Sequence, residues 1–179
     1  MTPSAARTRI LHTAHDLFYA EGVRAIGIDR IIAEAEVTKT TFYRHFPSKN
    51  DLILAYLDYR HTRWMDWFTG ALARHGGTLA ALGPAMAEWF RDPGFRGCAF
   101  LNSVSDIGPA LPEVQRITLA HKNDVAAVLA DLLPPSPDRD AQALALCVAM
   151  DGAILRASFE PAPEAALSAL ARLITGVNA

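Results

Sequence analysis

The segment from Gly27 to Phe46, GIDRIIAEAEVTKTTFYRHF, limits the possible folds of this chain more than any other segment. It contains two short runs in which apolar residues recur at helical spacing, separated by residues that suit a tight turn. Three isoleucines define the apolar side of the first run, and Val37 lies in the turn. In the second run, Phe42 and Phe46 lie four residues apart and therefore share one helix face. We predict two short helices joined by a tight turn, with the aromatic pair anchoring the second helix to the core.

The other side of the second helix carries almost only hydrogen-bond donors. Thr38 is suited to cap its start. A short helix that is packed by aromatic residues and carries outward hydroxyl, phenol and cationic groups fits a DNA major groove, where Thr can contact a thymine methyl and Arg can bind guanine. The alternative is a solvated amphipathic helix without a partner. The candidate DNA-contacting residues are Lys39, Thr40, Thr41, Tyr43, Arg44, His45 and Lys49.

The rest of the chain has helical patterning interrupted by Gly and Pro clusters. No alternating stretch is long enough to predict a sheet, so we expect an all-α fold. A Ser48-Lys49-Asn50-Asp51 capping box predicts the start of a further helix after Pro47. The predicted helices outside the segment above cover roughly residues 4–21, 48–69, 79–91, 98–106, 112–133, 138–159 and 163–174.

The predicted helix over 138–159 is apolar on two opposite sides. One side carries Leu144, Val148 and Leu155, and the other carries Leu146, Met150 and Ile154. A helix of this kind must be covered on both sides. A second subunit is one possible cover, and a deeply buried core within one chain is the alternative. Together with the last helix, the pattern predicts half of an intermolecular four-helix bundle whose interface includes Leu146, Met150, Ala153, Ile154, Leu170, Leu173 and Ile174.

Aromatic residues concentrate in the middle of the chain and are candidates for a small-molecule pocket or for the core. His121 lies on an apolar stripe, which is typical of a core histidine but also suits a polar group in a pocket. Asp151 lies in an otherwise apolar helix and must have a partner if it is buried. The candidate pocket residues are Trp64, Trp67, Phe68, Met86, Trp89, Phe90, Phe100, Asn102 and His121.

Composition and charge narrow the function classes. Hydrophobic residues make up 51% of the 179, and the net charge is −2. Residues 1–63 are slightly basic and the remainder is acidic, as suits a protein that touches phosphate at one end only. We expect a soluble, cytoplasmic protein, because no secretory signal or membrane-spanning segment is evident.

The sequence contains no pattern that indicates a cofactor or an enzyme. Cys98 and Cys147 fit no metal or redox spacing and are expected to be buried, although a sensing role stays open. We therefore expect no metal and no cofactor. Ser103, Ser105 and Asp106 have no histidine at a suitable spacing, so we expect that the protein is not an enzyme.

The segment VTKTTFYRHFPSKNDL, Val37 to Leu52, closely resembles the DNA-binding domain of the TetR family of bacterial transcriptional regulators. Three positions depart from the usual family pattern: Thr40 replaces a common Gly, Glu36 occupies a turn position where Gly or Ala is common, and Asn50 replaces a frequent Glu. A second segment, from Phe95 to Asp106, resembles one branch of the family in which Gly-Cys-x-Phe-x-Asn precedes an acidic residue.

This resemblance implies a homodimer of about nine helices per subunit. Residues 4–64 would form the three-helix DNA-binding domain, with its helix-turn-helix at 27–46, and residues 65–179 the effector-binding and dimerisation domain. The third helices of a dimer would enter successive major grooves of a palindromic operator. We predict a repressor that a small apolar or aromatic ligand releases from DNA. The alternative is a regulator of the same type that activates transcription or has no small-molecule effector.

Overall fold

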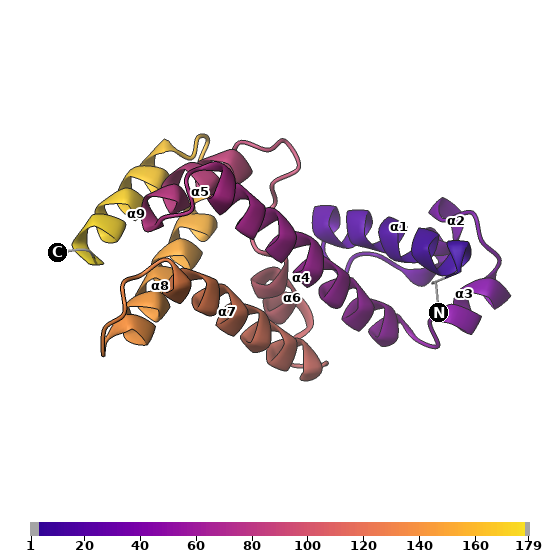
Figure 1. Cartoon of the computed structure of the whole chain (residues 1–179). Coiled ribbons are helices and arrows are strands. Elements are labelled where there is room, and N and C mark those ends of the chain that lie inside the picture. The colour runs from indigo at the N-terminus through magenta and orange to yellow at the C-terminus, as the bar shows by residue number, and fades with distance from the viewer. Residues whose placement is uncertain (1–3, 178–179) are drawn as a thin grey trace. The chain divides into compact units, whose positions relative to one another are not determined.

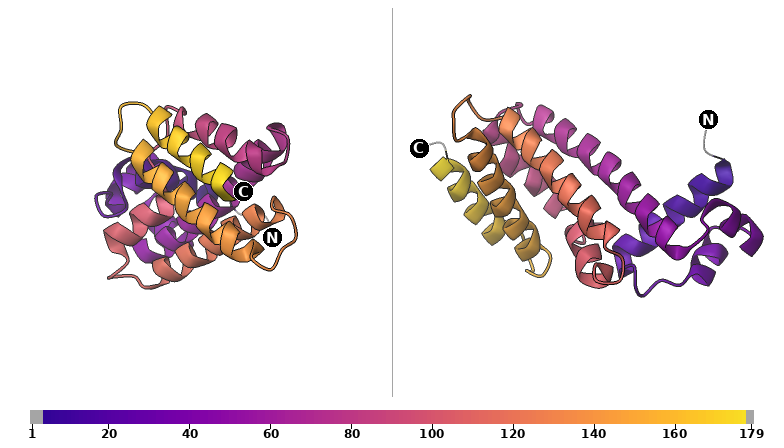
Figure 2. Two further views of the ribbon diagram at one scale, coloured as in Figure 1. Left: turned by 90° about the vertical axis from the view of Figure 1, so that its left-hand side faces the viewer. Right: turned by 90° about the horizontal axis from the view of Figure 1, so that it is seen from below.

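The structure is a computed structural model that describes residues 4–177 (Figures 1 and 2). In that range, the chain forms nine α-helices, one short 3₁₀ helix (η1, Leu79–Ala81) and no β-strand, which confirms the predicted all-α fold. No helix within 4–177 is both long and apolar enough to cross a membrane. The α-helices are α1 Ala5–Glu21, α2 Ile28–Glu34, α3 Lys39–His45, α4 Lys49–Arg74, α5 Leu82–Phe90, α6 Ala99–Ile107, α7 Glu113–Asp131, α8 Arg139–Ala157 and α9 Glu164–Val177.

The helix ends in the first third of the chain follow the capping signals in the sequence. Ser4 caps α1 by accepting a hydrogen bond from the Arg7 amide, and α1 ends at Gly22, whose φ of +88° suits glycine. At the start of α4, the Ser48 hydroxyl accepts from the Asp51 amide at 3.1 Å and donates to its carboxylate at 2.6 Å. The capping box is therefore confirmed.

Helix α4 is longer than predicted. The sequence analysis ended it near Thr69, but the structure continues it to Arg74. The Thr69 hydroxyl donates to the Met65 carbonyl at 2.9 Å, so this side chain is satisfied inside the helix and does not end it. The chain leaves the helical conformation at Gly76 and Gly77, which both have positive φ.

The chain divides into two compact units. The first contains the chain up to Thr62 and the segment Ala99–Thr118, and the second contains Arg63–Cys98 and the chain from Leu119 onward. In the first unit, α1, α2 and α3 pack on one another around a core of fully buried side chains. These include Ile10, Phe18, Ile31, Phe42, Phe46, Leu52 and Tyr56.

A buried polar pair joins α1 to α4 within the first unit. Arg60 lies with its guanidinium 4.0 Å from the centre of the Tyr19 ring, and its Nη1 is 3.5 Å from Nε2 of His15. Nδ1 of His15 is 2.8 Å from the carboxylate of the exposed Asp16. This arrangement fixes the side of α4 on which α1 lies, and the sequence pattern did not reveal it.

In the second unit, α8 and α9 form a helical hairpin and lie side by side (Figures 1 and 2), and α5 packs against α9. The core of this unit contains Phe68, Met86 and Leu129, together with the inward side of the hairpin. That inward side includes Leu146, Met150 and Leu170, which are at most 1% exposed.

Candidate nucleic-acid interface

The α2–turn–α3 segment forms the frame of the candidate interface. Gly27 precedes α2, and Thr38 precedes α3 and caps it by accepting from the Thr41 amide at 3.1 Å. Between the helices, Glu36 has a φ of +51°, the left-handed conformation that glycine adopts most easily. Glu36 therefore adopts a backbone conformation that is unfavourable for a residue with a side chain, at a turn position where the family commonly has Gly or Ala.

The buried side of α3 is aromatic, as predicted. Phe42 is fully buried and Phe46 is 2% exposed, and their ring centres are 6.2 Å apart. The Arg7 guanidinium of α1 lies 5.1 Å from the centre of the Phe46 ring. These contacts fix the rotation of α3 about its axis and thereby determine which side chains face outward.

Four of the seven predicted DNA contacts lie on the open side of this short helix. Lys39, Thr40, Tyr43 and Arg44 are exposed, and the exposed fraction of Tyr43 is 40%. Thr41 is half-buried, and its hydroxyl accepts from the Thr38 hydroxyl at 2.9 Å, which occupies part of its hydrogen-bonding capacity. The open side of α3 thus presents a cation at each end with a hydroxyl and a phenol between them.

The other two predicted contacts, His45 and Lys49, are half-buried and belong to the frame around α3. Nε2 of His45 lies 3.1 Å from the Ser4 hydroxyl, so this histidine ties the end of α3 to the start of α1. The Lys49 ammonium lies 6.0 Å from the centre of the Phe18 ring. Burial lowers the pKa of Lys49, and the carboxylate of Asp106 partly offsets that effect.

Two residues at the start of α1, its cap Ser4 and Arg7, were not singled out as site residues by the sequence analysis and lie beside the end of α3. Ser4 reaches it through His45, and Arg7 reaches it through Phe46. Ser4 was recognisable only as the start of a helix, because spacing along one helix does not indicate which distant helix lies next to it. Ser4 and Arg7 extend the polar surface beyond the helix-turn-helix itself.

The cations near α3 differ in how firmly a carboxylate binds them. Arg30 binds Glu21 and Glu34, with N–O distances of 2.7 Å to each, and the hydrogen bonds to both carboxylates raise its pKa. Arg30 is therefore held in place by two carboxylates of its own unit. Lys39 lies 4.0 Å from Asp29, and both side chains are largely exposed, so this pair can open at little cost.

Seven of the nine predicted pocket residues lie in the second unit, where most of them contact one another. Trp64 is at the centre of an aromatic cluster, with ring-centre distances of 4.7 Å to Phe68, 5.6 Å to Trp89 and 5.3 Å to His121. The buried Nε1 of Trp64 has no hydrogen-bond partner. Phe95, 5.1 Å from Trp89, also belongs to this cluster and was missed because it lies in a loop.

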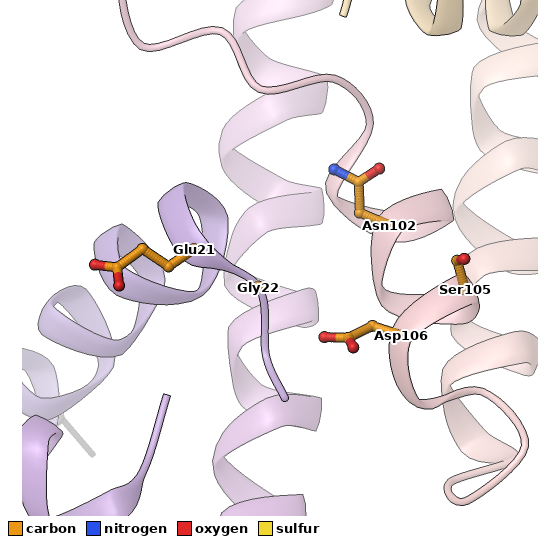
Figure 3. A pocket seen from close by; sticks show the side chains of 5 residues that line it. All are labelled: Glu21, Gly22, Asn102, Ser105 and Asp106. Carbon is orange, nitrogen blue, oxygen red and sulfur yellow. The ribbon is translucent and has the colours of Figure 1, made fainter. Parts of the chain in front are cut away.

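The remaining two, Phe100 and Asn102, lie on α6 in the first unit. Phe100 is buried, whereas Asn102 is exposed and lines a hollow of about 410 Å³ (Figure 3). The other residues that line this hollow are Glu21, Gly22, Ser105 and Asp106. The nine predicted residues are therefore divided between the two units and do not form a single cluster within either one.

The structure does not support the side of α8 that the sequence analysis assigned to a dimer interface. Six of the seven assigned residues are buried inside their own chain, and only Leu173 is well exposed, at 53%. The opposite side of α8 carries Leu144, Val148 and Leu155, which are 60–65% exposed. The buried six are Leu146, Met150, Ala153, Ile154, Leu170 and Ile174.

Asp151 has the partner that burial required. The Lys122 ammonium of α7 donates to its carboxylate, and both side chains are mostly buried. Cys98 and Cys147 are buried free thiols, as predicted, and burial raises the pKa of Cys147. The described part of the chain contains no group of three or more His, Cys, Asp or Glu side chains that could hold a metal ion.

Comparisons with known proteins agree with this geometry. Residues 10–56 match the family described as bacterial regulatory proteins, tetR family. A TetR-family transcriptional regulator from Streptomyces coelicolor shares 40% identity, with 96% of this chain and 93% of that chain covered and a TM-score of 0.84. The regulatory protein TetR from Rhodobacter sphaeroides shares 27% identity, with 97% and 99% covered and a TM-score of 0.77.

The match to curated proteins is shorter. An HTH-type transcriptional regulator from Staphylococcus aureus is 48% identical over 46 residues, which are 26% of this chain and 25% of that protein. The chain thus spans about a quarter of the length of the curated relatives that it matches.

A helix-turn-helix head on an all-helical body defines a class of DNA-binding regulators. Within that class, the chain belongs to the TetR family of bacterial transcriptional regulators. The family assignment made from Val37 to Leu52 is confirmed, as is the expectation of a regulator in place of an enzyme.

Proposed function

We propose that this protein is a dimeric cytoplasmic repressor that reads a palindromic operator with α3 and releases it when a small apolar or aromatic ligand binds. The observation that carries this proposal is the asymmetry of α3. Phe42 and Phe46 fix its inner side, while Lys39, Thr40, Tyr43 and Arg44 remain exposed on the outer side.

The exposed side chains divide into two chemical roles. Arg44 can donate two hydrogen bonds to a guanine, and the Thr40 methyl can contact a thymine methyl, so these two would read sequence. Lys39 and Tyr43 suit phosphate contacts, which set register and affinity. His45 and Lys49, being half-buried, would orient the end of α3 and supplement the phosphate contacts from the frame.

The outer side of the α8–α9 hairpin supports a dimer. Leu144, Val148 and Leu155 on α8 and Leu173 on α9 are all more than half exposed and lie on neighbouring helices. Exposed small residues on the same helix, Ala141, Ala145 and Gly152, would let a second hairpin approach closely. A twofold arrangement that pairs this surface with itself would form a four-helix bundle and cover the apolar side chains of both copies.

The aromatic cluster of the second unit supports the effector part of the proposal. A flat apolar ligand would stack among Trp64, Trp67 and Trp89, and the unpartnered Trp64 Nε1 would donate to an acceptor on it. The ligand shifts the DNA-bound population only to the extent that it binds the released state more tightly. In this proposal, residues 4–64 read DNA and residues 65–179 bind the effector and dimerise.

The test begins with selection of a duplex from a random-sequence DNA pool by the wild-type protein. Affinity is then measured for the double variant Arg44→Ala/Tyr43→Ala, with Arg116→Ala as a control that removes an exposed cation from α7. We expect the double variant to lose at least a hundredfold in affinity and the control to change little. Operator binding that survives the double substitution would overturn the assignment of α3.

A further inference from the structure

The turn between α2 and α3 leaves one backbone carbonyl without a bond inside the turn. The Glu36 amide donates to the Ala33 carbonyl at 3.2 Å, and the Val37 amide donates at 3.2 Å to the carbonyl one residue earlier, that of Ile32. With Glu36 in the left-handed conformation, these two bonds form the pattern that ends many α-helices. Neither bond uses the carbonyl of Ala35, the residue that follows α2, so this carbonyl needs a donor from another part of the chain.

Arg9 of α1 supplies that donor. Its Nε donates to the Ala35 carbonyl at 2.8 Å, across 26 positions of the sequence. Ala35 is fully buried, with an exposed fraction of 0%, so water is poorly placed to replace the guanidinium as a donor. Because a buried carbonyl that loses its donor is costly, the bond resists any movement of the turn away from α1.

The bond acts at the point in the chain that sets the direction of α3. Glu36 follows Ala35 directly, and its φ of +51° is unfavourable for a residue with a β-carbon. Thr38 caps α3 only two residues later, so a rotation about the backbone of Glu36 would turn α3 against α2 and displace its outward side chains. The Ala35 carbonyl lies in the peptide plane that precedes Glu36, and a hydrogen bond to it therefore holds one side of this rotation.

Contact with a DNA phosphate is the alternative role for Arg9, because this residue is exposed and belongs to the DNA-reading unit. The two roles need different parts of the side chain. Support of the turn needs an N–H at the ε position and no charge, whereas a phosphate contact needs the positive charge. The bond in the structure uses Nε, so the geometry favours support of the turn.

We propose that Arg9 is a positioning residue for DNA reading, which holds the turn after α2 so that α3 keeps the orientation that binds the operator. Arg9 acts through the Ala35 carbonyl and not through the DNA. Loss of the bond lowers the population of the correctly oriented α3, and operator affinity falls by the same factor. This inference rests on the proposed function and adds to it a residue that lies outside the helix-turn-helix.

The test compares two variants that both remove the positive charge. In Arg9→Gln, the amide nitrogen occupies the same position along the side chain as the Nε of arginine, so it still donates to the Ala35 carbonyl. Arg9→Met has a similar length and no donor. Affinity is measured for the duplex that the wild-type protein selects. We expect Arg9→Met to bind about fivefold more weakly than Arg9→Gln, which is the effect of one lost hydrogen bond.

A scrambled duplex and a salt series separate positioning from phosphate contact. The two variants should bind the scrambled duplex equally and show the same salt dependence on the selected duplex, because they carry the same charge. The difference between them on the selected duplex should shrink in a Glu36→Gly background, because glycine adopts the left-handed conformation without strain and the turn then depends less on Arg9.

Equal affinity of Arg9→Gln and Arg9→Met for the selected duplex overturns the inference, as does a difference that persists undiminished in the Glu36→Gly background. Circular dichroism at the binding temperature verifies that each variant is folded. If Arg9→Met is not folded, Arg9→Gln decides the result: the salt dependence of the wild-type protein supports the inference, and a slope reduced by about one overturns it in favour of a phosphate contact. Failure of the wild-type protein to select any duplex counts against the proposed function instead.

Discussion

Helix α3 and helix α8 differ in how clearly their sequences distinguish an inner from an outer side. On α3 the two sides differ in chemistry, with phenylalanines inside and hydroxyl, phenol and cationic groups outside. On α8 both sides are apolar, with Leu146 and Met150 buried and Leu144 and Val148 exposed. The lesson is that a hydrophobic pattern identifies a face only when the opposite face is polar.

The comparison also separates two kinds of exposed surface. The outer side of α3 consists of polar groups that are stable in water and need no partner for folding. The outer side of the α8–α9 hairpin consists of branched apolar side chains, for which exposure is unfavourable. A partner at α3 is therefore inferred from chemistry, whereas a partner at α8 is inferred from the hydrophobic effect.

The largest effect is expected when a charge is placed on either side of α8, because the two sides differ in burial. Leu146→Asp should destabilise the protomer by more than about 4 kcal/mol, because it buries an unpaired carboxylate in the core. Leu144→Asp should leave the protomer folded and shift the proposed dimer to monomer. Thermal unfolding and light scattering measure the two effects, and the assignment of the two sides fails if Leu144→Asp unfolds the chain.

The same contrast can be tested within α3 by truncating adjacent aromatic residues. Phe42→Ala should cost about 3–5 kcal/mol in the free energy of unfolding, because Phe42 is fully buried. Tyr43→Ala should change stability by less than about 1 kcal/mol while weakening DNA binding. Denaturant unfolding and a DNA-binding titration give the two numbers. Similar stabilities for the two variants would contradict the assigned rotation of α3.

A finer test asks whether Thr40 contacts a base of the operator. Thr40→Ala removes the methyl group proposed to contact thymine and should reduce discrimination at one base pair of the operator by about 1 kcal/mol. Thr40→Val keeps the methyl group and serves as the matched control. Competition binding with singly substituted duplexes gives the discrimination, and a uniform loss across all base pairs would assign Thr40 to phosphate contact.

The smallest expected effect concerns the turn between α2 and α3. Glu36 has a φ of +51°, so Glu36→Gly should stabilise the chain by up to about 1 kcal/mol. Glu36→Ala removes the same side chain without relieving the backbone and is the control. The melting temperatures of the two variants measure the difference, and equal values would show that the turn carries no strain.

Much of the fold was predictable because the determining signals are local. Thr38 and Ser48 cap helices where the sequence placed caps, and all the predicted helices are present. The end of α4 was placed too early, because the Thr69 hydroxyl bonds within its own helix. Local signals specify where helices start more reliably than where they end, since a cap is one residue and an end depends on competing contacts.

The sequence alone determined the all-helical architecture, the helix-turn-helix and four of the outward residues of α3, because each follows from spacing within one short segment. Only the tertiary structure decided which side of α8 faces the core, that His45 bonds to Ser4, and that Asp106 bonds to the turn after α1. These contacts are made between residues that are far apart in the chain. They depend on how helices pack, and the period of a single helix contains no information about its neighbours.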